Sequence, residues 1–197
     1  MDETLDIAPF PLLRWDTYSW AGTVTLPSWA GFQARGGAYG SRSSKKPSDG
    51  TARLHVAVED HKAQTPPTAA QISAMQHLLD NEAAVASAVL RAIFEMYPEE
   101  KAKYEDAYDE EDGATLPKIS DPSELRTLMR LSTVHVLYVT KGDTAYMGFE
   151  FRCAWEAEHG AGVMTHLGRI VEVGPADCSF VEWYARRDAE GRNGSPA

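Results

Sequence analysis

The 197-residue sequence has no long apolar run. A helix that crosses a membrane needs about 18 consecutive apolar residues, and no stretch of the chain approaches that length. The first six residues, Met1 to Asp6, are acidic, whereas a secretory signal has a basic start followed by an apolar segment. We therefore expect a cytoplasmic chain that neither crosses nor binds a membrane.

Cysteine is scarce, because Cys153 and Cys178 are the only two in the chain. They form no Cys-x-x-Cys pair and lack histidines at the spacing that a structural zinc site requires. A reducing cytoplasm keeps such residues as thiols, and Cys153 falls in an apolar strand pattern, where a buried role is expected. We expect no metal and no cofactor.

Basic residues are in the minority, with 19 Lys and Arg against 29 Asp and Glu and a net charge of −10. Such a chain repels the phosphate backbone, so nucleic acid is not expected as a partner unless a basic patch is segregated on the surface. Two interpretations of the acidity stay open. It either maintains solubility or steers a cationic protein partner toward the chain.

Enough apolar residues are present, at 43%, to build the core of one soluble domain, predicted to span residues 1–197. Alternating patterns predict strands, and apolar residues three and four apart predict helices. The predicted strands are 14–20, 23–26, 52–59, 133–139, 145–154, 162–166 and 169–173, and the predicted helices are 69–79, 82–97, 121–130 and 179–187. This order predicts an α+β fold, a mainly antiparallel sheet with the helices grouped between N-terminal and C-terminal strands.

Two segments are predicted to lie outside regular structure. Residues 31–51 are rich in glycine, serine and basic residues, which predicts a mobile basic loop. Their glycines match neither phosphate-binding pattern, GxGxxG or GxxxxGK[ST], so a phosphate cradle is not supported. Residues 188–197 are predicted to be a frayed tail.

An acidic run with interleaved tyrosines covers residues 99–112. One interpretation is a solvated helix face followed by a loop. The other is a docking surface, in which tyrosines anchor a cationic partner and carboxylates form the rim. The candidate partner-binding residues are Tyr104, Glu105, Tyr108, Asp109, Glu110, Glu111 and Asp112.

A second polar cluster lies in a predicted hairpin. Its candidate site residues are Trp155, Glu156, Glu158, His159 and His166. Carboxylate and imidazole groups are suitable zinc or iron ligands, so a metal-binding protein or hydrolase is the alternative function. The spacing does not match HExxH, and no GxSxG motif is present. The competing interpretation is structural, with glycines serving turns and Trp155 covering the hairpin.

Residues 155–177 combine Trp, two residues, Glu-His-Gly, one residue, Gly-Val, two residues and His with a later Gly-x-Ala-Asp. This pattern resembles the C-terminal signature of a family of uncharacterised bacterial proteins. The resemblance implies a gene neighbourhood of secreted toxins or contact-dependent antagonism, in which small acidic proteins serve as immunity factors. It implies no catalytic residue.

These observations together predict a non-catalytic bacterial binding protein, an immunity protein that binds a cognate toxin or effector and occludes its basic active-site cleft. The acidic run is the expected contact. A third interpretation is an assembly role, for example a homodimer that seals an exposed strand edge.

Overall fold

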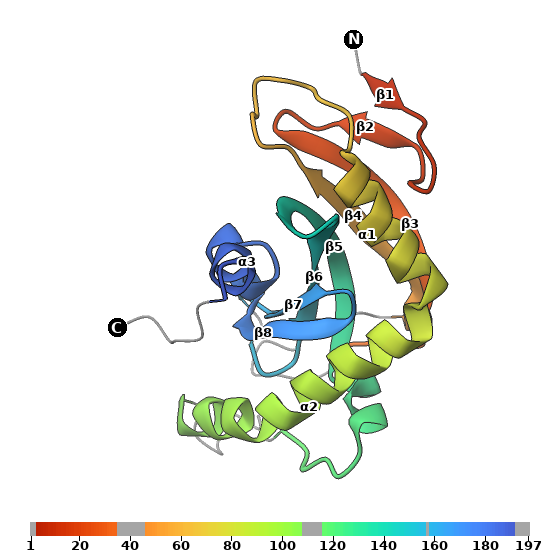
Figure 1. Ribbon diagram of the computed structural model, residues 1–197. Coiled ribbons are helices and arrows are strands. Elements are labelled where there is room, and N and C mark those ends of the chain that lie inside the picture. The colour runs from red at the N-terminus through yellow and green to blue at the C-terminus, as the bar shows by residue number, and fades with distance from the viewer. Residues whose placement is uncertain (1–2, 35–45, 108–115, 157, 192–197) are drawn as a thin grey trace.

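The structure is a computed structural model that describes residues 3–34, 46–107, 116–156 and 158–191. It is an α+β fold built on an eight-stranded, mostly antiparallel sheet, which confirms the predicted fold class (Figure 1). Strand order in the sheet follows chain order. The strands are β1 (Thr4–Leu5), β2 (Leu13–Trp15), β3 (Ser19–Ala30), β4 (Asp49–Ala57), β5 (Met129–Lys141), β6 (Thr144–Cys153), β7 (Ala161–His166) and β8 (Arg169–Pro175).

One strand pair breaks the antiparallel pattern, since β4 and β5 run parallel at the middle of the sheet. A parallel pair needs a long crossover, and here the crossover contains α1 (Ala69–Asp80), α2 (Glu82–Ala107) and the 3₁₀ helix η3 (Pro122–Thr127). The register places Val56 opposite Val136. The grouped helices of the sequence prediction therefore join the two halves of the sheet.

Helices α1 and α2 cover one face of the sheet, which we call the helix-covered face (Figure 1). Strand alternation points Leu54 and Val56 of β4 and Val134 of β5 into this core, where Met75 of α1 and Ile93 of α2 meet them. All five side chains are buried. The largest core cluster of the molecule lies here.

The opposite face, which we call the outer face, is covered over β5 to β8 by the 3₁₀ helix η4 (Ala176–Ser179) and by α3 (Glu182–Ala189). Ala185 of α3 packs there with Tyr146 and Met164 in a second, smaller core. Asp188 fixes the end of α3 by accepting hydrogen bonds from Tyr146 Oη at 2.7 Å and Arg169 Nη2 at 2.6 Å. The frayed tail predicted from residue 188 is therefore wrong at its start.

Glycines allow η4 to lie directly on the sheet. An added Cβ on Gly148 of β6 would stand 1.6 Å from the carbonyl oxygen of Ser179, and one on Gly162 of β7 would stand 2.5 Å from that of Ala176. The prediction that the signature glycines serve turns fits Gly160, whose φ is +77°. It is wrong for Gly162, which is a strand residue chosen for close backbone approach.

Local signals predict the starts of α1 and η3, whereas the terminal helix α3 begins at Glu182 and not at Ser179. Thr68 and Gln71 form the capping box of α1, and Asp121 and Glu124 form that of η3.

Several boundaries differ from prediction. In place of strands at 14–20 and 23–26, the structure has β2 and the single long strand β3, which runs without a break through Ala21 and Gly22. The helix predicted at 121–130 is a 3₁₀ helix that ends at Thr127, and β5 begins at Met129. Helix α2 continues through Pro98 to Ala107, and β4 begins at Asp49, inside the segment 31–51 that was predicted to be a loop.

Backbone hydrogen bonds also order the ends of that segment. Gly31 N donates to Ser48 O at 2.7 Å, and Ser48 N donates to Phe32 O at 2.8 Å. Residues 35–45, which carry most of its basic side chains, lie outside the described residues. Within the described part of the chain, no helix is both long enough and apolar enough to span a membrane.

The contact between Gly148 and η4 generates a stability prediction. Gly148→Ala forces the Ser179 backbone off the sheet, so we expect unfolding free energy to fall by about 2 kcal/mol or more in urea titrations. The matched control is Gly142→Ala, where φ is +61° and nothing lies within 4 Å, and it should cost about 1 kcal/mol. Equal losses at the two positions would contradict the close packing of η4.

Candidate functional site

The predicted hairpin site is a tight turn between β6 and β7. Glu156 Oε1 accepts hydrogen bonds from the backbone amides of Glu158 at 3.1 Å and His159 at 3.2 Å. Trp155 is buried beneath the turn, with its ring 5.2 Å from that of Tyr97 in an edge-to-face contact. Each of these features shapes the turn or attaches it to α2.

The hairpin histidines do not converge, because His159 precedes β7 and His166 ends it. The His159 side chain is 74% exposed, and its Nδ1 lies 3.5 Å from Glu156 Oε1. His166 is buried, and its Nε2 lies 3.1 Å from Lys141 O and 3.3 Å from Thr144 O. The proposed pairing of these two histidines as ligands is therefore wrong, and no metal-holding group of three His, Cys, Asp or Glu occurs among the described residues.

The acidic docking surface is only partly described. Tyr104 is 6% exposed and packs into the main core, so it cannot serve as the surface anchor predicted for it. Glu105 is exposed and forms an ion pair with Lys101. The other five candidates lie outside the described residues: Tyr108, Asp109, Glu110, Glu111 and Asp112.

A polar cluster on the outer face was not anticipated from the sequence. Strand pairing puts His55 of β4 directly opposite His135 of β5, with ring centroids 5.4 Å apart. Glu150 of β6 bridges His135 Nε2, at 3.1 Å from its Oε2, and Ser132 Oγ, which donates to its Oε1 at 3.2 Å. Phe180, just after η4, covers the His135 ring at 5.3 Å.

The electrostatics of this cluster favour an anionic Glu150 and a neutral His55. The hydrogen bond from His135 lowers the pKa of Glu150 below its ordinary value of 4.5. Burial, followed by the neighbouring His135, lowers the pKa of His55 from 6.5 to about 4. Ser132 and His135 both bind the carboxylate, so the cluster differs from a catalytic triad, in which the histidine itself contacts the hydroxyl.

Arginines surround the cluster on the same face. Arg53 lies two residues before His55, and Arg130 of β5 lies directly opposite Arg152 of β6. Their neighbours in the strands, Leu54 and Leu131, point into the helix-covered core, which places the arginines on the outer face. The Arg-x-His alternation in residues 53–55 indicated a shared face, but only the β4–β5 pairing brings the two histidines together.

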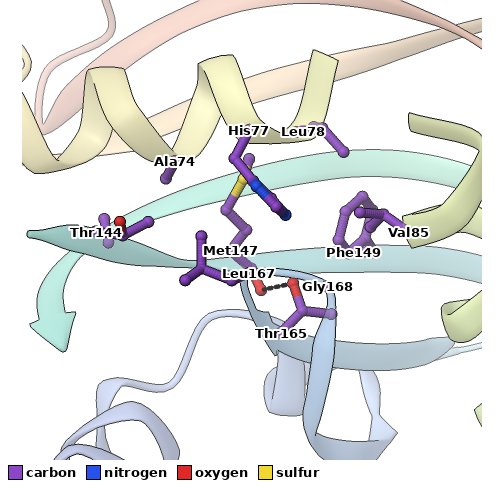
Figure 2. A pocket seen from close by; sticks show the side chains of 11 residues that line it. Ala74, His77, Leu78, Val85, Thr144, Met147, Phe149, Thr165, Leu167 and Gly168 are labelled. Carbon is purple, nitrogen blue, oxygen red and sulfur yellow. Dashed lines mark hydrogen bonds between the residues drawn. The ribbon is translucent and has the colours of Figure 1, made fainter. Parts of the chain in front are cut away.

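The described structure holds a small cavity between α1 and the sheet (Figure 2). Its volume of about 10 Å³ is that of about one water molecule, too little for a substrate. His77 of α1, Val85 of α2 and Gly168 of the β7–β8 turn are among its lining residues, and Thr165 Oγ1 donates to Met147 O at 3.3 Å beside it. This cavity is a packing gap and not a binding pocket.

Comparison with known proteins gives a family whose function is unknown. Residues 41–181 match a family model described as "Domain of unknown function (DUF6985)". No curated protein and no solved structure matches the chain. The matched range includes the outer-face cluster and the whole β5–β8 half of the sheet.

The low pKa of His55 in the folded protein predicts that the protein loses stability as the pH falls. Between pH 6.5 and about 4 the unfolded chain takes up a proton at His55 that the folded chain does not, so stability falls as the pH drops through this window. In urea unfolding from pH 7.5 to 4.5, His55→Gln should flatten this decline. Thr23→Gln, an exposed and non-titrating change on the same face, should leave it unaltered. Matching pH profiles for wild type and His55→Gln would contradict the assignment.

Proposed function

We propose that the chain, which belongs to this family of unknown function, is a non-catalytic binding protein of the immunity type. In this proposal it binds a cognate toxin and occludes a basic active-site cleft. The observation that carries the proposal is the acidic end of α2, residues 99–107, which lies at the far end of the helix from α1 (Figure 1).

The charge of this helix end is not balanced by its lysines. Lys101 pairs with Glu105, and Lys103 pairs with Glu99 at 3.0 Å and Glu100 at 2.8 Å. Asp106 is exposed beyond these pairs, and the sequence continues with four consecutive carboxylates at 109–112. The segment therefore presents net negative charge, which attracts a cationic protein surface.

Two tyrosines of α2 attach the helix end to the body of the protein. Tyr97 Oη donates to Pro117 O at 2.7 Å, and Tyr104 is buried in the core. An acidic surface fixed in advance loses little conformational freedom on binding, which favours affinity. The role of Tyr104 is thus to position the carboxylates and not to enter the partner.

The experiment co-expresses the tagged chain with each protein encoded beside its gene and measures binding and rescue of growth. We expect one basic partner that is toxic alone and harmless in the pair, with binding weakened by salt. Asp106→Lys should weaken binding about tenfold by placing like charges together. Glu95→Lys, a change of equal charge at an exposed position earlier on α2, is the matched control and should have little effect.

Two results would contradict the proposal. The first is a partner whose affinity responds equally to Asp106→Lys and Glu95→Lys, since the acidic end would then not be the contact. The second is the absence of any toxic neighbour that the chain neutralises.

A further inference from the structure

We propose that Arg53, Arg130 and Arg152 form a second docking site, the arginine patch, which receives an acidic segment of a partner protein. The patch lies on the outer face of β4, β5 and β6, whereas α1 and α2 lie on the helix-covered face. This second site goes beyond the proposed function, because the patch carries positive charge and the acidic end of α2 carries negative charge.

The patch contains two like charges at facing positions of neighbouring strands. Arg130 and Arg152 are directly opposite each other on neighbouring strands, a position in which Cβ atoms are about 5 Å apart and like charges are destabilising. Each guanidinium group can bind a carboxylate through two N–H donors, so two neighbouring arginines suit an acidic ligand. An acidic ligand relieves the repulsion, so the pair is suited to binding.

Some arginines of the molecule have an internal ion-pair partner. Arg169 pairs with Asp188, and Arg187 pairs with Glu172. By contrast, Arg53, Arg130 and Arg152 form no ion pair or hydrogen bond with any residue that the structure describes.

Two carboxylates lie near the patch, and neither forms an ion pair with its arginines among the described residues. Asp49 interacts with Arg130 only through space and uses its oxygen to accept from Thr51 N at 2.9 Å. Glu150 is held by His135 and Ser132. The guanidinium groups of the patch therefore keep their donors available.

The surroundings of the patch favour a protein partner over a nucleic acid. Phe180 is 45% exposed over His135 and supplies an apolar contact, and arginine with aromatic side chains is typical of protein interfaces. The net charge of −10 repels a long polyanion, while a short acidic segment contacts only the local positive charge. Neighbouring strands are about 4.8 Å apart. The three strands of the patch therefore extend about 10 Å across the sheet, which is the scale of a short peptide.

The test measures binding of a fluorescein-labelled peptide with six consecutive glutamates to the full chain by anisotropy at low salt. We expect saturable binding that Arg130→Gln with Arg152→Gln weakens at least about tenfold. Arg91→Gln is the matched control, since Arg91 is exposed on α2 and likewise has no partner among the described residues. It should leave binding unchanged. Thermal unfolding of the double variant should occur at the wild-type temperature or above, because a repulsive pair is lost.

Three outcomes overturn the inference. They are no saturable binding of the peptide, an equal loss with Arg91→Gln, and tighter arginine-dependent binding of a 12-nucleotide single-stranded DNA, which would assign the patch to nucleic acid. Asp106→Lys should retain peptide binding. A failure of the arginine patch is therefore distinguishable from a failure of the acidic α2 surface.

Discussion

The parallel pairing of β4 with β5 is the constraint on which the rest of the structure depends. It joins an N-terminal antiparallel unit to a C-terminal one and makes a single sheet of eight strands. The crossover that the pairing requires carries α1 and α2 over one face, so the main core forms there. On the other face, the same pairing sets His55 beside His135 and brings Arg53 onto the surface that Arg130 and Arg152 share.

Much of the fold was predictable because its signals are local. Capping residues such as Thr68 and Asp121 marked helix starts, and strand alternation marked both halves of the sheet. The β4–β5 pairing was not predictable, since residues about 80 positions apart meet there only after the helices pack. The burial of Tyr104 was likewise hidden, because α2 continues past Pro98 and turns that side chain toward the core.

The candidate sites also differ in whether local sequence or tertiary contacts reveal them. Local pattern identified the β6–β7 hairpin, and the structure assigns its residues to shape: Glu156 organises the turn, and Gly162 allows η4 to lie on the sheet. The outer-face cluster needed tertiary pairing, because His135, Glu150 and Phe180 come from three separate elements. Sequence spacing carries no information about such contacts.

Charge is separated across the sheet in a way that the net value conceals. The total of −10 predicted an acidic surface, and the end of α2 provides one, yet the outer face carries arginines that have no ion-pair partner in the described part of the chain. A molecule with two surfaces of opposite sign distinguishes its partners by where they dock. In this account, the single sheet serves as the scaffold for both surfaces.

The central claim, that the chain binds a basic partner through the end of α2, is tested most directly by hydrogen exchange of the full chain with and without that partner. The account predicts slowed exchange of backbone amides in peptides covering residues 99–112, with no change in the hairpin between β6 and β7. Slowed exchange confined to that hairpin, with residues 99–112 unaffected, would contradict it.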